Sequence, residues 1–146
     1  MIKKLKKKLL FLILLTPITL FSQDSNVYAG LEVSAKSIKV SILELTDIKK
    51  GNYNILDTWS ENVNVGKNIS ISGTINPKDI ATTTISLKEN YEKLKITKGI
   101  DPSRIFVVIS SGVSIAKNTN ELISAIEKEI AITPKTITVD EETKLL

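Results

Sequence analysis

The sequence predicts an α/β domain, in which three consecutive strands precede a helix, a strand, a second helix and a short final strand. Three observations predict this order. Apolar and polar residues alternate over residues 27–65, apolar residues then recur at helical spacing after Asn76, and a nearly continuous apolar run follows at residues 104–110. The apolar content is mainly Ile, Val and Leu with only 5% aromatic residues, which suits a sheet covered by helices.

The first three strands are expected to form a meander. Residues 27–32 form a short apolar segment, and alternating apolar residues resume at 37–45 after the polar turn at residues 34–36. Lys49-Lys50-Gly51-Asn52 has the composition of a turn, and the alternation that follows predicts a third strand from residue 55 to about residue 65.

A long helix is predicted to begin after Asn76, since asparagine is a preferred N-cap residue and Pro77 suits the first helical position. Asp79 lies in the first turn, and Lys98-Gly99 closes the helix. The apolar-spaced positions between them are Ile80, Thr84, Leu87, Tyr91 and Leu94.

The remaining elements alternate between strand and helix. The run at residues 104–110 predicts a central strand buried on both faces. Asn118 or Asn120 is expected to cap a second helix, residues 136–139 form a fifth strand, and Asp140-Glu141-Glu142 starts a third helix. The second helix presents Leu122, Ile123, Ile126 and Ile130 on one side.

Residues 1–22 have the three parts of a secretory signal peptide. Five lysines precede the apolar run that starts at Leu9, and small or polar residues follow from Ser22. The apolar stretch of about 13 residues is shorter than the roughly 20 needed to span a bilayer, although an uncleaved anchor is the alternative. We therefore expect export to the periplasm or the medium, with residues 23–146 as one domain that no longer contacts the membrane after cleavage.

Composition excludes several function classes. The chain has 20 basic and 16 acidic residues. Five of the basic residues and none of the acidic residues precede residue 23, so residues 23–146 contain 15 basic and 16 acidic residues. This near-neutral balance predicts no nucleic-acid partner. The absence of histidine and cysteine excludes serine–histidine hydrolysis, disulfides and zinc sites built on these residues.

Three segments resemble the exopolyphosphatase and guanosine pentaphosphate phosphohydrolase family. Ala-Gly-Leu-Glu-Val-Ser-Ala-Lys-Ser-Ile-Lys at 29–39 resembles its opening Gly, apolar, Asp, apolar, Gly-Ser-Asn-Ser, apolar, Arg. Residues 107–118 resemble its buried strand with Thr-x-x-x-Arg-x-Ala-x-Asn, and residues 137–145 resemble Ile-Ser-Gly-x-Glu-Glu-Ala-Arg-Leu. The resemblance implies the N-terminal subdomain of a ribonuclease-H-like (actin-like ATPase) fold.

By this resemblance, the chain would take part in hydrolysis of a phosphoanhydride, in polyphosphate or a nucleotide, with Mg²⁺ as cofactor. Such chemistry needs donors around the phosphate, a cation, and a base for water. The phosphate-binding role falls to Ser34, Lys36 and Ser37 in the strand-to-strand turn. Glu32 would hold the metal, and Glu142 would be catalytic by orienting the attacking water.

Several positions depart from the family pattern. Glu32 replaces Asp, Ser34 replaces Gly, Ser114 replaces the Arg of the middle segment and Val139 replaces Gly. The family's second phosphate loop, Asp-x-Gly-Gly-Gly-Ser, does not occur within residues 1–146. The sequence is therefore expected to be an incomplete N-terminal portion that is inactive by itself.

Other readings of the same residues remain open. Glu141-Glu142 also fits the first turn of a helix, Glu32 a solvent-facing strand position, and Lys36-Ser37 an ordinary hairpin turn. For the whole chain, the alternatives are a degenerate, non-catalytic binding or structural module of the same fold, and an unrelated small α/β domain. The oligomeric state is left open.

Overall fold

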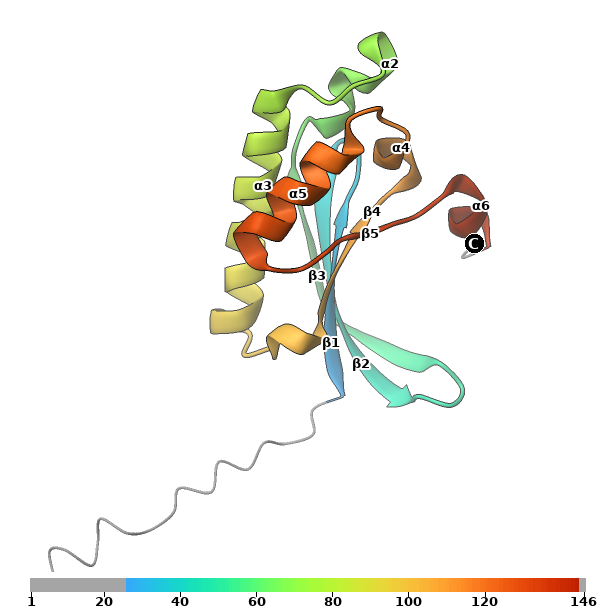
Figure 1. The fold of residues 1–146 in the computed structure, drawn as a ribbon. Coiled ribbons are helices and arrows are strands. Elements are labelled where there is room, and N and C mark those ends of the chain that lie inside the picture. The colour runs from blue at the N-terminus through green and yellow to red at the C-terminus, as the bar shows by residue number, and fades with distance from the viewer. Residues whose placement is uncertain (1–25, 145–146) are drawn as a thin grey trace, which may run out of the picture.

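Five strands form one mixed sheet with the spatial order β3-β2-β1-β4-β5. The computed structural model describes residues 26–144, so the predicted signal peptide at residues 1–22 lies outside the described residues. In chain order the strands are β1 (Val27–Val33), β2 (Ser37–Asp47), β3 (Asn52–Asn62), β4 (Ile105–Ile109) and β5 (Lys135–Thr136). Figure 1 shows the two long helices on one side of this sheet.

The predicted three-strand meander is confirmed. β1 and β2 pair antiparallel, with Leu31 opposite Val40, and β3 pairs antiparallel with β2. β3 begins three residues earlier and ends earlier than expected. The register between β2 and β3 shifts at two points. The pairing continues as far as Asp47 opposite Asn52, beside Gly51 at the hairpin tip, where φ is +69°. After Asn62 the chain leaves the sheet, because the next residues turn into a 3₁₀ helix, η2 (Val65–Lys67).

The long helices begin where the sequence predicts. Asn76 caps α3 (Pro77–Glu92), with its side chain accepting a hydrogen bond from the Lys78 amide at 2.9 Å. The helix continues as a π-helical turn, η3 (Lys93–Thr97), and the chain reverses at Gly99, where φ is +67°. α5 (Thr119–Ile130) follows Asn118, whose side chain makes no capping hydrogen bond.

The Asn118 side chain instead bridges two distant segments. Its amide oxygen accepts from the Ile75 amide at 2.8 Å, and its amide nitrogen donates to the Ile75 carbonyl at 3.0 Å. This pair of bonds ties the start of α5 to the loop before α3. The remaining short helices are α2 (Ile69–Ser72), η4 (Pro102–Arg104), α4 (Ser111–Ser114) and α6 (Val139–Thr143).

The core lies between the sheet and the α3–α5 layer. Alternate strand residues such as Leu31, Val40 and Ile109 are fully buried there, together with Leu87 of α3 and Leu122 of α5. Burial of these aliphatic side chains is the main stabilising contribution to the domain. Within residues 26–144, no helix is long and apolar enough to cross a membrane.

Two predictions about the later strands are wrong. β4 is not buried on both faces: Ile105, Val107 and Ile109 face the helices, whereas Phe106 is 53% exposed on the opposite face. α3 and α5 cover only one side of the sheet, so β4 alternates as a half-buried strand does. The fifth strand is only two residues long rather than residues 136–139, because Thr138 already caps α6.

Candidate functional site

The carboxyl ends of the parallel strands meet at one edge of the sheet. Val33 at the end of β1 is opposite Ile109 at the end of β4, and Ile109 is opposite Thr136 of β5. Hydrogen bonds continue this register past the strands, from the Ser110 amide to the Val33 carbonyl at 3.0 Å and from the Ile137 amide to the Ile109 carbonyl at 2.9 Å. The edge of an α/β sheet where strands end is the usual place for a ligand.

The β1–β2 turn lies at this edge and is closed by its own serines. The Ser34 hydroxyl donates to the Ser37 carbonyl at 2.7 Å and accepts from the Ser37 amide at 3.2 Å. The Ser34 amide also donates to the Ser37 carbonyl, at 2.9 Å. The amides of both serines are therefore already bonded within the turn. The amides of Ala35 and Lys36 are the ones that this turn could donate to an anion.

A glycine on a different segment fixes the position of this turn. The Gly66 amide donates to the Ala35 carbonyl at 2.8 Å, and the Val63 amide donates to the Lys36 carbonyl at 2.9 Å. A Cβ atom at position 66 would lie 2.5 Å from the Ala35 Cβ, so no other residue fits without a shift. The role of Gly66 cannot be seen in the sequence, since a single glycine in a loop does not reveal which segment approaches it.

Glu32 and Lys39 are neighbours on the sheet face away from α3 and α5. They are register partners on β1 and β2, and the Lys39 Nζ lies 3.7 Å from a carboxylate oxygen of Glu32. Both line a shallow depression of about 490 Å³, together with Ser37. The other residues lining it are Gly30, Ser41, Thr58, Trp59, Ser60 and Val108. The depression thus combines one carboxylate, one ammonium group and several hydroxyls.

Lys39 is a candidate residue that the sequence analysis did not single out. It ends the first family-like segment, at the position where the family pattern has Arg. Glu32 and Lys39 face each other because β1 and β2 pair antiparallel. This pairing could have been predicted from the two strands and the turn between them. A cation at this point can offset phosphate charge, although Lys lacks the bidentate fork of Arg.

The structure separates Lys36 from Glu32 and Ser37. The Lys36 side chain is exposed and lines a second depression beside the segment that includes Asn62, Asn64, Gly66 and Lys67. The three residues predicted to bind phosphate are therefore not equivalent. Ser37 lines the depression that contains Glu32, Ser34 uses its hydroxyl inside the turn, and Lys36 lines a different hollow.

Glu142 lies in α6, next to the start of α4. Its carboxylate accepts a hydrogen bond from the Ser111 hydroxyl, and the Ser114 hydroxyl donates to the Ile137 carbonyl at 3.1 Å. Ser111 is buried at the end of β4, so this bond holds α6 against the strand-end edge. Glu142 is not among the residues that line the Glu32–Lys39 depression.

Glu141, by contrast, closes the helix N-terminus. Its carboxylate accepts from the Thr138 amide at 2.9 Å, while its own amide donates to the Thr138 hydroxyl at 3.2 Å, which is a capping box. Hydrogen bonds from Thr138, with the charge of Lys135, lower the pKa of Glu141. The two adjacent glutamates thus differ in their contacts: Glu141 caps α6, whereas Glu142 accepts a hydrogen bond from Ser111.

The described residues offer little for a bound metal. Within residues 26–144, no three acidic, histidine or cysteine side chains lie close enough to hold a metal ion. Glu32 provides one carboxylate, and Lys39 already pairs with it. Mg²⁺ commonly binds through one or two carboxylates, water and the phosphates of the substrate, so Glu32 fits only as a single ligand beside a phosphate that brings the ion with it.

Comparisons with family models and with curated protein sequences find no match. Solved structures do match. A Ppx/GppA family member from Aquifex aeolicus superposes with a TM-score of 0.67 at 20% identity, over 80% of this chain and 36% of that chain. An exopolyphosphatase from Cytophaga hutchinsonii matches with a TM-score of 0.69 at 20% identity, over 82% and 36%. An exopolyphosphatase-like protein matches with a TM-score of 0.69 at 17% identity, over 84% and 36%.

The chain has the Ppx/GppA fold. This confirms the predicted α/β class and the ribonuclease-H-like, actin-like arrangement of a three-strand meander followed by helix, strand, helix and strand. The chain spans 36% of the length of the structures that it matches, so it represents a part of that fold.

Proposed function

We propose that this chain is the N-terminal portion of an exported exopolyphosphatase-like protein, and that it binds a phosphoanhydride ligand without hydrolysing it alone. The likeness to exopolyphosphatases supports polyphosphate or a nucleotide as the ligand, and the nearly neutral charge of the chain from Gln23 onward gives no basic patch for a nucleic acid. The observation that supports the proposal is the strand-end edge, where the β1–β2 turn, the Glu32–Lys39 depression and Glu142 occur in a chain of Ppx/GppA fold.

Each group would have a defined part in binding. The Lys39 ammonium would offset phosphate charge, and hydroxyls such as that of Ser41 would donate to phosphate oxygens. The Ser37 hydroxyl, which donates to Ser34 Oγ at 3.1 Å, would have to exchange that bond for one to the phosphate. Glu32, which pairs with Lys39 in the absence of ligand, would be the residue that holds a Mg²⁺ ion accompanying the phosphates. Mg²⁺ would supply neutralisation of the charge on the phosphate oxygens.

Hydrolysis needs more than these residues supply. A transferred phosphoryl group must be stabilised around its equatorial oxygens while a positioned water attacks in line. The residues that line the depression would contact a phosphate from one side, and Glu142 is held by Ser111 and does not line the depression. We therefore expect binding without turnover.

The test is a binding titration of the purified chain with polyphosphate and with a nucleoside polyphosphate, in the presence of Mg²⁺. Lys39→Ala should weaken the affinity about tenfold or more, the size expected for loss of a hydrogen bond to a charged group. Lys49→Ala, an exposed lysine at the hairpin tip, is the matched control and should bind as the wild type does. Phosphate release in the same samples should stay at background.

The outcomes separate the parts of the proposal. Measurable phosphate release by the wild-type chain would show that the expectation of inactivity is wrong, and absence of any binding would remove the ligand assignment. The export component is checked independently by mass spectrometry of the mature N-terminus, which should begin near residue 23 after secretion. An intact Met1 on a membrane-bound product would instead indicate an uncleaved anchor.

A second candidate function is a non-catalytic structural module of the same fold. It is favoured by the way in which the candidate groups satisfy one another: Ser34 bonds Ser37 within the turn, and Glu32 pairs with Lys39. This candidate predicts no change in melting temperature with polyphosphate or nucleotide, since ligands that bind only the folded state raise it.

A further inference from the structure

A second hollow, of about 550 Å³, borders the β1–β2 turn and is distinct from the Glu32–Lys39 depression. Its polar side chains come from the turn, from the segment that follows β3 and from α2. They are Lys36, Asn62, Asn64, Lys67 and Ser70, which we call the Lys36–Lys67 hollow. None of these five residues lines the Glu32–Lys39 depression, so the two sites share no polar side chain.

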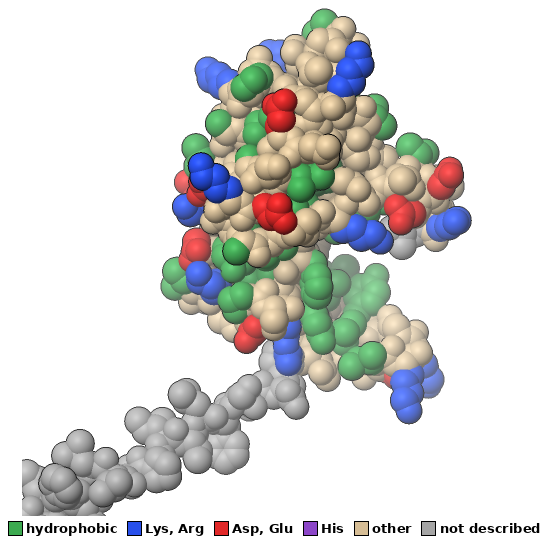
Figure 2. All heavy atoms as spheres, in the orientation of Figure 1, with side chains coloured by type: hydrophobic (Ala, Val, Ile, Leu, Met, Phe, Trp, Pro, Cys, Tyr) green, Lys and Arg blue, Asp and Glu red, His purple; other side chains and the backbone are tan. Residues whose placement is uncertain are grey.

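The charged side chains that line this hollow are all positive. Lys36 and Lys67 line it, and no aspartate or glutamate does. Neither lysine forms an ion pair within residues 26–144. Lys67 also lines a neighbouring hollow, in which the charges of Lys78 and Asp79 offset each other. Figure 2 shows basic side chains at the end of the molecule that carries α2.

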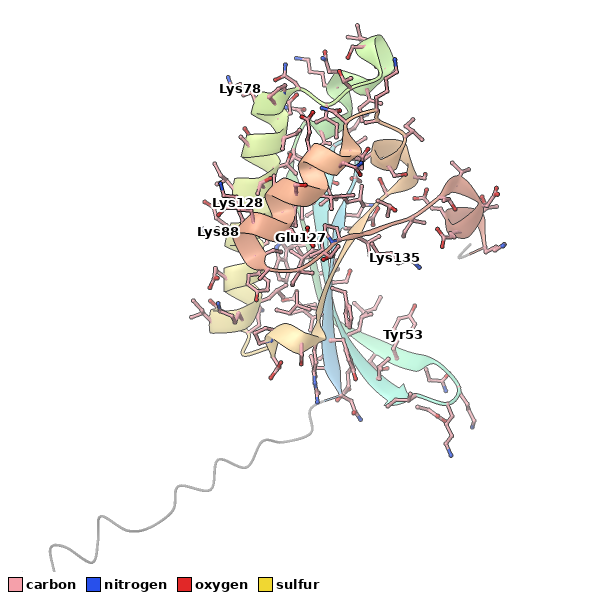
Figure 3. All side chains as sticks on the ribbon, in the orientation of Figure 1. Tyr53, Lys78, Lys88, Glu127, Lys128 and Lys135 are labelled. Atoms are coloured by element: carbon pink, nitrogen blue, oxygen red, sulfur yellow. The ribbon has the colours of Figure 1, made fainter. Side chains whose placement is uncertain are left out.

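The helix side of the molecule shows how this chain usually compensates its lysines. Lys88 and Lys128 line the groove between α3 and α5, and Figure 3 shows both on the outer surface of these helices. Glu89 and Glu129 line the same groove, and Lys88 pairs with Glu129 at 2.8 Å. The protein itself therefore offsets the positive charge there. The Lys36–Lys67 hollow has no such carboxylate, so its positive charge can be offset by an anion from solution.

Tertiary contacts hold the main chain on both sides of this hollow. The Val63 amide donates to the Lys36 carbonyl at 2.9 Å, and the Gly66 amide donates to the Ala35 carbonyl at 2.8 Å. The glycine at position 66 allows this close approach, and Lys67 follows it directly. The fold thus brings two lysines that are far apart in the sequence to one hollow, although like charges repel each other.

Neutral hydrogen-bond donors complete the lining. The side chains of Asn62, Asn64 and Ser70 form no hydrogen bond with any other residue in the range 26–144, and Asn64 precedes η2 without capping it. The main-chain amides of Ala35 and Lys36 are also unpaired among the described residues. Amide, hydroxyl and ammonium groups can all donate to the oxygens of one oxyanion, and bonds to a charged acceptor are the stronger ones.

We propose that the Lys36–Lys67 hollow is a second anion site, which binds a phosphate group. A phosphate monoester or inorganic phosphate carries about two negative charges near pH 7, which matches the two ammonium groups. The chemistry is the same for free inorganic phosphate and for one phosphate of a longer chain. Because both lysines are exposed, the predicted dissociation constant for inorganic phosphate is in the millimolar range, on the order of 1–10 mM. The proposal does not rest on ligand binding at the Glu32–Lys39 depression.

The experiment is a titration of the purified, isotopically labelled chain with sodium phosphate, followed by NMR of the backbone amides. Sodium chloride keeps the ionic strength constant. The amides of Lys36, Asn64 and Lys67 should shift with one common dissociation constant. Lys67→Gln, which removes the charge and keeps a long polar side chain, should weaken binding about tenfold. Lys128→Gln is the matched control and should bind as the wild type does, and the spectra verify that each variant is folded.

A parallel titration with tripolyphosphate separates the two sources of the phosphate. Tighter binding that shifts the amides of both Lys36 and Lys39 supports a chain that spans the two sites. Shifts at Lys36 and Lys67 no larger in affinity than with inorganic phosphate support a site for a single phosphate.

Three outcomes overturn the proposal. They are equal affinity of Lys67→Gln and the wild type, no shift at Lys36 or Lys67 up to about 50 mM phosphate, and loss of these shifts in Lys39→Ala. The last outcome would place the anion in the Glu32–Lys39 depression alone and would leave the proposed function standing. Shifts at Lys67 without any at Lys39 would instead support this site and count against the proposed function.

Discussion

The two faces of the sheet are made by the same strands and yet differ in almost every physical respect. Toward α3 and α5, β1 presents Leu31 and Val33, both 0% exposed. On the opposite face the same strand presents Tyr28 and Glu32, both partly exposed. Adjacent residues point in opposite directions on a strand, so one residue step moves a side chain from the core to solvent.

This comparison shows that the covering layer, rather than the strand sequence, determines what an apolar residue contributes. Phe106 and Val107 are neighbours on β4, both apolar and both suited to a strand. Val107 is buried under the helices and stabilises the fold, whereas Phe106 is half-exposed on the uncovered face. The candidate ligand groups Glu32 and Lys39 also belong to the uncovered face.

The largest expected effect contrasts one residue from each face. Leu31→Ala should lower the free energy of unfolding by about 3 kcal/mol, because the side chain is fully buried and its removal leaves a cavity. Phe106→Ala in the monomer should cost less than about 1 kcal/mol, since its ring is half in solvent. Urea denaturation at a concentration where the chain is monomeric measures both. Similar losses would show that the open face is covered in solution.

A polar contact on the covered face should have an intermediate effect. The Trp59 indole donates to the Asn90 side chain at 2.7 Å, and the Asn90 amide donates to Glu61 at 2.6 Å. Asn90→Ala removes this bridge between β3 and α3 and leaves a partly buried indole N–H unpaired. It should lower stability by about 1–2 kcal/mol. Ser60→Ala, an exposed residue on the open face, is the control and should be nearly neutral by the same denaturation assay.

The smallest effect concerns the ion pair on the solvent side of the helix layer. Hydrogen bonding from Lys88 lowers the pKa of Glu129 below its ordinary value of 4.5. A lowered pKa in the folded state means that the contribution of Glu129 is present at neutral pH. It is lost as the pH falls through the folded-state pKa. The melting temperature of Glu129→Gln should therefore be slightly below that of the wild type at pH 7, and the difference should shrink as the pH falls below 4.5.

A pH-independent difference between these two proteins would contradict that account. Lys78→Ala is a suitable control, because Lys78 is an exposed lysine of α3 that forms no ion pair within residues 26–144 and does not contribute to the lowered pKa of Glu129. Since both Lys88 and Glu129 are substantially exposed, the effect should shrink further at high salt.

Element identity was largely predictable, whereas boundaries were not. The N-cap signal of Asn76-Pro77 located the start of α3, and alternation located β1 and β2, because both signals are local. The end of β3 at Asn62 depends on hydrogen bonds between residues 35–36 and residues 63–66. The short β5 depends on the capping box at Thr138. The contacts of residues 35–36 with residues 63–66 are not visible in a local pattern, whereas Thr138-Val139-Asp140-Glu141 has the spacing of a capping box and could have located the start of α6.

The sequence singled out the segments of the candidate site, and the structure shows how they are arranged. The family-like segments include the β1–β2 turn and α6, which lie at the same sheet edge as the end of β4. The structure places Ser37 with Glu32, separates Lys36 from them, and adds Lys39. Whether any of these residues binds phosphate stays a prediction.

By itself, the sequence determined the order of strands and helices, the fold class and the chemical types available, with no histidine and no cysteine. These follow from local periodicity and composition, which act over a few residues. Only the tertiary structure decided which face of the sheet is covered, why residue 66 must be glycine, and which side of the β1–β2 turn each polar residue occupies. These depend on contacts between segments far apart in the chain, which no local pattern encodes.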